Sequence, residues 1–394
     1  MKWEYKTLDQ LGTVSRGKSK HRPRNDPKLF GGKYPFIQTA DVKNADYYIT
    51  KYSDTYNESG LAQSKLWDKG TLCITIAANI ADTGVLAFPA CFPDSIMGFV
   101  PFEGVANTRF IKYCFDRLQR DCKQISQGTA QDNLSWEKLS TIKFCIPEYK
   151  EQCRIADILS AYDDLIENNQ KQIKLLEEAA QRLYKEWFVD LRFPGYENTK
   201  IVDGVPEGWS KSTVGNICKL RKVVITPDKI ESNTPYIGLE HMPRNDICLS
   251  TWGKSEEINS NKFIYLKKDV LFGKIRPYFH KVGFALNDGI TSTDTMVMVA
   301  DQNLWGLLLV TVSSDAFVDF SYQNCKEGAK MPRADWKQME KYAIMIADQA
   351  TQKLFEQEIL VITNKISALA FQCRSLREAR DRMLPKLMGG EVEA

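Results

Sequence analysis

Residues 147–187 constrain this chain more than any other stretch, because their apolar side chains follow the spacing of a coiled-coil seam. Apolar positions recur at alternating steps of four and three residues over more than four heptads. A helix of this length would be roughly 60 Å long, which is more than a compact domain needs. Asn169 is the one polar residue on the seam, and such a residue typically fixes register and partner. The predicted seam consists of Ile155, Leu159, Tyr162, Ile166, Asn169, Ile173, Leu176, Ala180, Leu183 and Trp187.

The same pattern recurs 200 residues later, with Arg380 as the one polar intruder. The segments before the two helices share landmarks at this offset, such as Trp136 and Trp336. The chain is therefore predicted to be a tandem repeat of a globular module followed by a long helix. Pro385 is expected to stop or kink the second helix, because proline lacks the amide donor, and Leu387 is expected to lie outside regular helix. The second seam consists of Phe355, Ile359, Ile362, Ile366, Leu369, Cys373, Leu376 and Met383.

Each module mixes short strands with a helix, which predicts an α+β fold. In the first module, residues 34–37, 71–76 and 84–88 are predicted strands and 107–125 is a predicted amphipathic helix. In the second, 235–237 and 269–272 repeat the strand pattern, and 304–322 is the expected helix. The predicted organisation is a first module over 1–146, a long helix over 147–190, a linker over 191–208, a second module over 209–346, and a second long helix with a tail over 347–394.

Seven lysines and arginines lie between residues 16 and 33, against a single acid, Asp26. Glycines and prolines in the same segment predict a loop rather than a helix. Seven cations on a loop repel one another unless a polyanion is near, so contact with phosphates is a natural use. A solvated surface loop explains the same residues equally well. The cations are Arg16, Lys18, Lys20, Arg22, Arg24, Lys28 and Lys33.

The second module carries different side chains on the repeated scaffold. Where the first has Ala77-Ala78-Asn79-Ile80, the second has Lys274-Ile275-Arg276-Pro277-Tyr278-Phe279-His280-Lys281. A duplicated scaffold with divergent loops suggests two related ligands that are bound in parallel.

Composition and motifs argue against catalysis and against metal binding. A net charge of +3 does not by itself indicate a nucleic-acid partner. Ten cysteines without a C-x-x-C pair, together with three histidines, predict no metal site. The sequence has no nucleotide-binding loop, no glycine-rich turn for S-adenosylmethionine and no credible Ser/His/Asp set. No apolar run reaches about 18 residues, so no membrane span is expected. The scattered cysteines predict reduced thiols in a cytoplasmic protein, and the missing motifs predict a non-catalytic binding protein.

The two helices carry a specific likeness. Pro147, Glu151-Gln152 and Ile155-Ala156, followed by Leu176-Glu177-Glu178-Ala179-Ala180-Gln181-Arg182-Leu183, resemble the central conserved region in specificity subunits of type I restriction–modification enzymes. Leu384-Pro385-Lys386-Leu387-Met388 and Gly389-Gly390-Glu391-Val392 are similar to that family's C-terminal ending. The likeness covers the whole chain in order, although Ala347 and Thr351 replace the proline and glutamate of the first copy.

The resemblance implies that the two helices pair as an antiparallel coiled coil, a rigid spacer between two target recognition domains. Each domain would read one half of a bipartite, asymmetric DNA sequence through the major groove. Two methyltransferase subunits would dock on the helices and domains, and two restriction subunits would join them for translocation and cleavage. S-adenosylmethionine would be bound by the methyltransferase partner and not by this chain.

Both modules are then expected to supply DNA contacts. In the first, the expected cations are Lys18, Lys20, Arg22 and Arg24, and the expected base readers are Gln38, Thr39 and Asn79. In the second, Arg276 can read guanine through O6 and N7, a pairing worth about 1–3 kcal/mol of discrimination. The second set is Lys274, Arg276, Lys281, Lys330 and Arg333. A salt bridge, or solubility alone, explains any single one of these residues as well.

On the residues alone, two other classes of protein stay open. One is a protein–protein adaptor with a coiled-coil spacer, and the other is a DNA enzyme whose site has no recognised motif. Cofactor binding by the purified chain would indicate the enzyme. Salt-dependent binding of duplex DNA would argue against the adaptor, because phosphate contacts weaken steeply with ionic strength.

Overall fold

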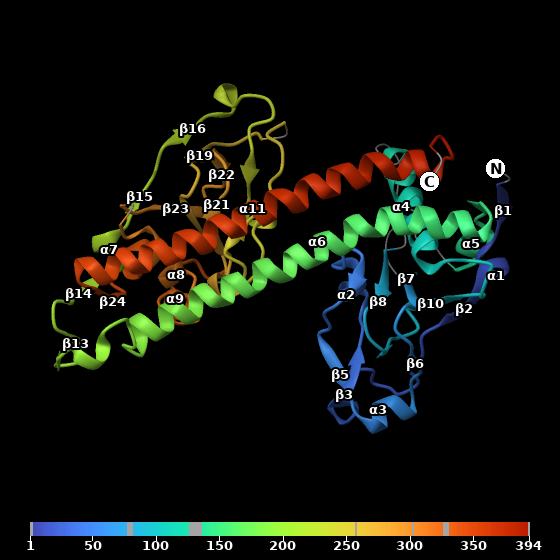
Figure 1. Ribbon diagram of the computed structural model, residues 1–394, viewed down its shortest axis with the longest axis horizontal. Helices are drawn as coiled ribbons and strands as arrows, with labels where there is room; N and C mark the ends of the chain where they lie inside the picture. The colour runs from blue at the N-terminus through green and yellow to red at the C-terminus, as the bar shows by residue number, and fades with distance from the viewer. Residues whose placement is uncertain are drawn as a thin grey trace. The chain divides into compact units, whose positions relative to one another are not determined.

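The computed structural model describes residues 3–76, 82–125, 136–256, 258–301, 303–325 and 331–392, without the side chains of 120–125, 136 and 138. The chain forms two compact units, residues 1–166 with 375–394 and residues 167–374. The division runs through both long helices, α6 (Tyr149–Tyr184) and α11 (Gln349–Met388), drawn in green and red in Figure 1. Each unit therefore combines one module with parts of both helices, whereas the sequence predicts modules and helices as separate pieces.

The first unit contains a five-stranded and a four-stranded sheet. The five-stranded order is β2 (Gly12–Arg16), β10 (Ile96–Pro101), β7 (Leu72–Thr75), β8 (Thr83–Leu86) and β4 (Tyr48–Ile49). The four-stranded order is β5 (Asp54–Tyr56), β3 (Phe30–Phe36), β9 (Ala90–Cys91) and β6 (Leu66–Trp67). Each sheet has one parallel pair, β4 with β8 and β3 with β9, and is otherwise antiparallel. The three predicted strands of the first module correspond to β3, β7 and β8.

The other elements of the first unit are short, apart from one helix. They are β1 (Glu4–Lys6), which pairs with β11 (Phe144–Ile146), the helices α1 (Leu8–Leu11), α2 (Thr39–Lys43), α3 (Glu58–Ala62) and α5 (Trp136–Thr141), and the 3-10 turn η1 (Pro27–Leu29). The exception is α4 (Thr108–Ile125), which confirms the predicted helix at 107–125.

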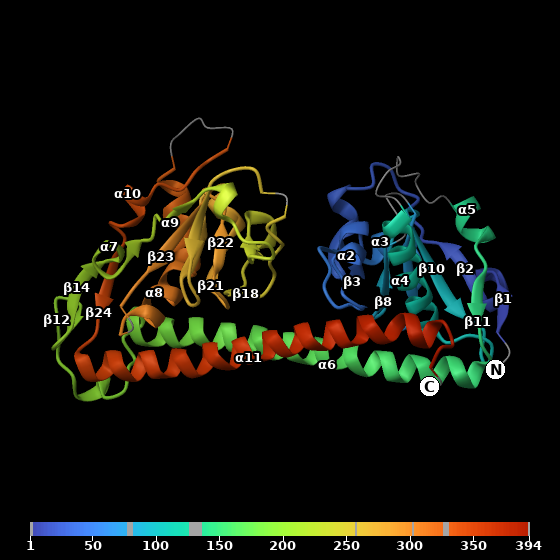
Figure 2. The ribbon, with the colours of Figure 1, turned by 90° about the horizontal axis from the view of Figure 1, so that it is seen from above.

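Helix α4 covers the five-stranded sheet next to β8 and β10 (Figure 2). Its apolar face is buried, with Phe110, Ile111 and Phe115 fully out of contact with water. Burying each of these side chains contributes about 2–3 kcal/mol. The same core includes Ile155 and Leu159 from the start of α6, so the long helix closes the module.

The second unit repeats most of this topology. Its five-stranded order is β15 (Lys219–Leu220), β23 (Thr295–Val299), β20 (Val270–Gly273), β21 (Val282–Ala285) and β18 (Cys248–Leu249). Its four-stranded order is β16 (Val224–Ile225), β19 (Lys262–Tyr265), β22 (Gly289–Thr291) and β17 (Tyr236–Ile237). The parallel pairs again are one per sheet, β18 with β21 and β17 with β22. The duplication inferred from sequence landmarks therefore extends to the strand order and directions of the five-stranded sheet. In the four-stranded sheets, β17, β22 and β19 correspond to β3, β9 and β6, but the fourth strand lies at the opposite edge, with β5 beside β3 and β16 beside β19.

The remaining elements of the second unit are also short. They are β12 (Ile201–Val202) with β13 (Val205–Pro206), β14 (Ser210–Thr213) with β24 (Ala343–Ile346), the helices α7 (Val214–Ile217) and α10 (Trp336–Met339), and the 3-10 turns η3 (Tyr196–Asn198), η4 (Pro227–Lys229), η5 (Leu239–His241) and η6 (Pro277–Phe279).

The single helix predicted at 304–322 is wrong, because the structure has two helices there. They are α8 (Trp305–Val312), in which every residue is buried, and α9 (Asp315–Gln323). The break lies at Ser313 and Ser314. The Ser314 hydroxyl accepts a hydrogen bond from the amide of Phe317 at 3.2 Å, which caps the start of α9 and competes with continuation of α8.

The two long helices run antiparallel. In the second unit, α6 ends in a π-helical turn, η2 (Lys185–Val189), in which Trp187 and Phe188 pack on Phe355 near the start of α11. In the first unit, Ile155 near the start of α6 shares a core with Leu387 near the end of α11. The end of each helix thus meets the start of the other. No described helix has both the length and the apolar character that a membrane span requires.

Most predicted seam positions lie on the inner face of the helices. Asn169 is also buried, and its Nδ2 has no hydrogen-bond partner among the described residues. The fully buried apolar members are Ile155, Leu159, Ile166, Ala180, Phe355, Ile359, Ile366, Leu369 and Cys373. The half-buried members are Tyr162, Ile173, Leu176, Leu183, Ile362, Leu376 and Met383.

Pro385 does not stop the second helix, and Leu387 lies on it. Pro385 cannot donate the hydrogen bond that its backbone position would otherwise make, but it sits within one turn of the helix end, so only three helical residues follow it. Leu387 is 1% exposed in the core of the first unit, and a guanidinium nitrogen of Arg117 donates to the carbonyl of Met388 at 2.7 Å. Burial and this terminal hydrogen bond therefore outweigh the cost of the proline.

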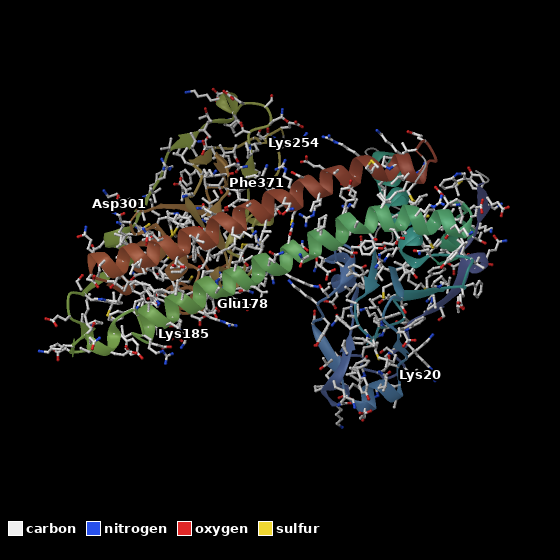
Figure 3. The ribbon with its side chains drawn as sticks, viewed as in Figure 1. Lys20, Glu178, Lys185, Lys254, Asp301 and Phe371 are labelled. Atoms are coloured by element: carbon white, nitrogen blue, oxygen red, sulfur yellow. The ribbon has the colours of Figure 1, made fainter. Side chains whose placement is uncertain are left out.

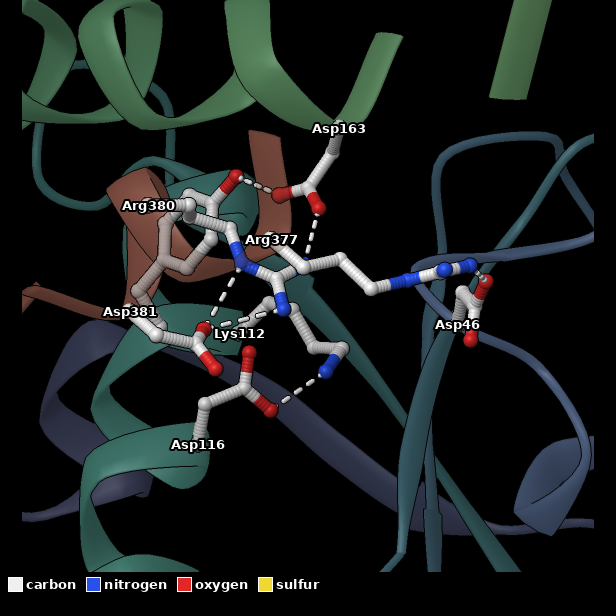
Figure 4. A network of polar contacts seen from close by, with 8 residues as sticks. Asp46, Lys112, Asp116, Asp163, Arg377, Arg380 and Asp381 are labelled. Atoms are coloured by element: carbon white, nitrogen blue, oxygen red, sulfur yellow. Dashed lines mark hydrogen bonds and ion pairs between the residues drawn. The ribbon is translucent and has the colours of Figure 1, made fainter. Parts of the chain in front are cut away.

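Arg380, the one polar residue at a position of the second seam, pairs with a buried acid. Its guanidinium donates to Asp163 on α6, and Asp163 also accepts a 2.5 Å hydrogen bond from the Tyr113 hydroxyl on α4 (Figure 4). Arg380 also pairs with Asp381 at 3.0 Å. Burial raises the pKa of the Asp163 carboxyl, against the attraction of Arg380. Three helices of the first unit therefore meet at one carboxylate.

Removing Arg380 should destabilise the first unit strongly. Arg380→Ala leaves the Asp163 charge buried without its cation, so we expect the free energy of unfolding to fall by about 3–5 kcal/mol in urea denaturation. Replacing the whole cluster by Leu at 163, Met at 380 and Phe at 113 should restore most of that loss. Arg382→Ala, at an exposed position of α11, is the control and should stay within about 0.5 kcal/mol of wild type. Equal effects of the two alanine variants would contradict the prediction.

In the second unit, carboxylates of both long helices accept hydrogen bonds from backbone amides of the module. Glu177 on α6 accepts from Ile247 and Cys248 at 2.9 and 3.2 Å. Glu356 on α11 accepts from Gly306 and Leu307 at the start of α8, at 2.6 and 3.0 Å. Burial raises the pKa of Glu177 to about 7, and the negative charge of Asp246 acts in the same direction.

The raised pKa of Glu177 predicts a pH-dependent stability. The unfolded carboxyl has a pKa near 4.5, so the folded state binds the proton more tightly. Its stabilising effect is complete below that pH and is lost as the pH rises through about 7. The loss should amount to about 3 kcal/mol by pH 8. Urea denaturation at pH 5 and pH 8 should show a smaller difference in Glu177→Gln than in wild type.

The control for this measurement is Glu178→Gln, because Glu178 is the next residue along α6 and is exposed (Figure 3). That variant should keep the pH dependence of the wild type. The same dependence in Glu177→Gln would show that another group is responsible.

Candidate nucleic-acid interface

In the first unit, residues 17–29 of the cation-rich segment form a loop between β2 and β3 that ends in the short turn η1. Arg16 and Lys33, at the two ends of the segment predicted as a loop, lie on the strands. The backbone of the loop is fixed at several points. The amides of Lys20 and His21 donate to the Gln63 side-chain oxygen at 2.6 and 2.9 Å, and Ser64 donates to the carbonyl of Lys18 at 2.7 Å. At Gly17, a Cβ would overlap the carbonyl oxygens of Phe92 and Pro93, so only glycine fits there. The loop is thus held in one conformation with its long cations outside.

Two of the four predicted contact cations in this loop are free to bind an anion. Lys18 and Lys20 are exposed, and no described residue accepts a hydrogen bond from either ammonium group. Figure 3 shows Lys20 projecting away from its module. Phosphate contact by these two lysines therefore costs no internal interaction.

The two arginines of the loop are already engaged. Arg22 donates to the carbonyls of Ser19 and His21 at 2.7 and 2.8 Å, and Arg24 forms an ion pair with Asp94 at 2.8 Å. Both side chains are exposed, but their donors are partly used within the loop. Their first effect is to shape the loop.

The predicted base readers of the first unit lie next to each other at the start of α2. The Gln38 amide donates to Asp54 at 2.6 Å, and its backbone precedes the helix. Thr39 is half-buried as the first residue of α2. Asn79, the third candidate, lies outside the described residues. The contact role of Gln38 and Thr39 stays a prediction.

In the second unit, the structure brings four of the five predicted cations together. Ile275 bridges to Arg333, and the amide of Arg276 donates to the carbonyl of Pro332 at 2.8 Å. The segment 331–334 therefore lies against the loop 274–281, which joins β20 to β21. Lys330 lies outside the described residues.

Three of these four cations have internal partners. Lys274 donates to the carbonyl of Thr293 at 2.7 Å, and Lys281 donates to that of Leu239 at 2.5 Å. Burial lowers the pKa of both lysines. Arg333 pairs with Asp294 at 2.7 Å. These residues therefore fix the loop, as the arginines do in the first unit.

Arg276 is different, because no described residue accepts a hydrogen bond from its guanidinium. Its backbone is in the left-handed region, with φ 51° and ψ 63°, and His280 at the other end of η6 has φ 51° and ψ 49°. Two non-glycine residues in this region store strain, which is frequent at ligand-binding sites. The side chain of Arg276 lies 5.8 Å from the centre of the Phe279 ring.

A second arginine near this ring was missed from the sequence. The guanidinium of Arg244 lies 4.0 Å from the centre of Phe279. One signal existed, since the pattern His-x-Pro-Arg-Asn-Asp occurs at both 21–26 and 241–246. The offset is 220 rather than 200, and the copies occupy different places, between β2 and β3 and between η5 and β18. The pattern is therefore not part of the duplication.

The comparisons with known proteins agree with this architecture. A family model described as "Type I restriction modification DNA specificity domain" matches residues 1–178, which end within α6. The MjaIX specificity subunit of a type I restriction enzyme from Methanocaldococcus jannaschii is 25% identical over 99% of this chain and 93% of its own length. The chain is thus similar along nearly its whole length to a specificity subunit of a type I restriction enzyme. This confirms the resemblance that the two helices carry.

Other specificity subunits are similar to parts of the chain or to its fold. The EcoR124I/EcoR124II specificity subunit from Escherichia coli is 23% identical over 48% of this chain and 48% of its own length. The crystal structure of an S subunit from M. genitalium has a TM-score of 0.55 at 16% identity, and the match covers 98% of this chain and 96% of that one. This last likeness concerns the fold alone. The residues that the family model matches lie within the first copy of the internal repeat.

Proposed function

We propose that this chain is the DNA-recognition subunit of a type I restriction–modification complex, and that each module reads one half of a bipartite, asymmetric sequence. The observation that carries this proposal is the contrast within the repeat. The five-stranded sheets of the two units share strand order and direction, yet the loops present different side chains, with exposed lysines in the first unit and arginines beside an aromatic ring in the second. Similar scaffolds with different loops suit two different half-sites.

In this proposal, α6 and α11 set the spacing of the half-sites and dock two methyltransferase subunits, and two restriction subunits join for cleavage. Exposed large apolar side chains on both long helices are compatible with a protein partner. They include Leu175, Leu354, Val361 and Phe371, the last of which is labelled in Figure 3. The complex would act in the cytoplasm.

We further propose that the chain itself is non-catalytic and that S-adenosylmethionine is bound by the methyltransferase partner. The absence of a cofactor motif in the sequence supports this assignment. The purified chain should neither bind the cofactor nor methylate DNA, and methylation should appear on addition of the methyltransferase subunit. Binding of S-adenosylmethionine by the isolated chain in calorimetry would refute the proposal.

The independence of the two modules can be tested by methylation mapping. Cells that carry the chain and its methyltransferase partner should modify one bipartite sequence, which sequencing of methylated DNA identifies. Replacing residues 274–281 should alter one half of that sequence and leave the other half and the spacer unchanged. Altered bases in both halves would contradict independent recognition, and unaltered bases would place recognition elsewhere in the module.

The free lysines of the first module predict a salt-dependent contact. We expect Lys18→Ala and Lys20→Ala each to weaken binding of duplex DNA by the methyltransferase complex equally for all sequences. Each should reduce the slope of log K against log salt by about 1, because one phosphate contact is lost. Arg24→Ala is the matched control, since Arg24 already pairs with Asp94, and it should change the slope less. An unchanged slope in both lysine variants would exclude this loop from the interface.

A further inference from the structure

Two arginines of the second unit lie beside one aromatic ring, Arg276 on the strained loop 274–281 and Arg244 on the segment before β18. The guanidinium of Arg244 lies 4.0 Å from the centre of the Phe279 ring, and that of Arg276 lies 5.8 Å from it. Arg244 is exposed and Arg276 is half-buried, and no described residue accepts a hydrogen bond from either guanidinium. Contact of a guanidinium with a ring leaves its N–H edges available for a planar acceptor.

The backbones that carry these arginines are tied to each other. The amide of Asn245 donates to the carbonyl of His280 at 3.1 Å, which joins the Arg244 segment to the end of η6. The amide of Arg276 donates to Pro332 at 2.8 Å, and the His280 ring contacts the carbonyl of Ser313 at 2.9 Å. Both arginines therefore stand on backbone that is held from several sides.

The neighbouring charges do not neutralise the pair. The pKa of Lys281 is lowered, first by burial and second by the positive charge of the nearby Arg244. Glu240 is the acid near Lys281. Cations gathered in this way repel one another in the free protein, so an anionic or strongly electronegative ligand is favoured.

Exposed aromatic side chains lie next to the pair. Tyr278 projects from η6 and meets Tyr322 of α9 edge to face, with 5.2 Å between ring centres, and the two are 46% and 47% exposed. Tyr278 also packs on Phe279, with 4.8 Å between centres. Large exposed rings beside free guanidinium groups are typical of surfaces that meet bases or deoxyribose.

The geometry points to Arg244 and Arg276 as a pair of guanine readers for the half-site of the second module, with Phe279 as the residue that positions them. This inference rests on the proposed function and names its chemistry. A guanidinium fork matches guanine O6 and N7 in the major groove, and discrimination needs a fixed fork. A phosphate does not need such a fork, because a flexible lysine can bind it equally well. At this surface the lysines, Lys274 and Lys281, donate to backbone carbonyls instead, which leaves the arginines to meet the DNA.

The test uses the complex of the full chain with its methyltransferase subunit. The half-site that changes when residues 274–281 are replaced is taken as the one that the second module reads. Substitution of its guanines, one at a time, by 7-deazaguanine removes the N7 acceptor and keeps pairing and phosphates intact. At one guanine or more, wild type should lose roughly 5- to 150-fold in methylation rate.

The variants Arg244→Lys and Arg276→Lys keep the charge and remove the fork. Each should lower methylation of the normal sequence by a similar factor, become insensitive to 7-deazaguanine at one position and accept other bases there. Phe279→Leu, which keeps both arginines, should relax the same positions partly. Arg182→Lys, at an exposed arginine of α6 in the same unit, is the control and should leave every base preference unchanged. Thermal melting of each variant verifies that it is folded.

Three results would overturn the inference. The first is a half-site of the second module that contains no guanine. The second is a wild-type complex whose methylation rate is insensitive to 7-deazaguanine. The third is a loss of DNA binding in the variants that is equal for all sequences and comes with a smaller salt slope, because that result indicates phosphate contact. The proposed function fails separately, if the wild-type complex shows no sequence-dependent methylation at all.

Discussion

Each long helix has an apolar stripe whose exposure to water is unfavourable. In each unit, the module and the other long helix bury that stripe together. In the first unit, Ile155 and Leu159 lie in one core with α4 and with the end of α11. In the second, Phe355 and Ile359 lie in one core with α8 and with the end of α6. A module without these helix segments would expose its own core, so module and helix have to fold together. This explains why the compact units divide the helices rather than the modules from the helices.

Apolar burial alone leaves the register of two helices poorly defined, and the polar contacts supply the missing information. Asp163 meets both Arg380 and Tyr113, and a shift of either helix by one residue would leave this carboxylate buried without partners. A buried ion pair adds little net stability over apolar packing, but its loss in a wrong register is expensive. Arg377 with Asp46 in the first unit and Lys174 with Asp246 in the second add contacts at equivalent module positions.

The duplication, the two long helices, α4 and a few strands of each module could be predicted because they depend on period and spacing, which a sequence displays directly. The helix break at Ser314 was missed although Ser313-Ser314-Asp315 is a capping sequence, because the apolar residues on both sides fit one continuous helix. The fate of individual cations could not be predicted. Arg24 pairs with Asp94 and Arg333 pairs with Asp294, and both acids are distant in sequence. The sequence does not distinguish a cation that pairs with such an internal acid from one that binds a phosphate.

Several of the hydrogen bonds that attach a module to the long helices are donated by backbone amides of the module. Gln152 accepts from the amide of Asn107, Glu356 from Gly306 and Leu307, and Glu177 from Ile247 and Cys248. An amide is present whatever side chain the residue carries, proline excepted. Mutation or recombination can therefore exchange nearly every side chain on the loops of a module without disturbing its attachment to the helices. Such a scaffold lets a lineage acquire new DNA specificities while the rest of its machinery stays unchanged.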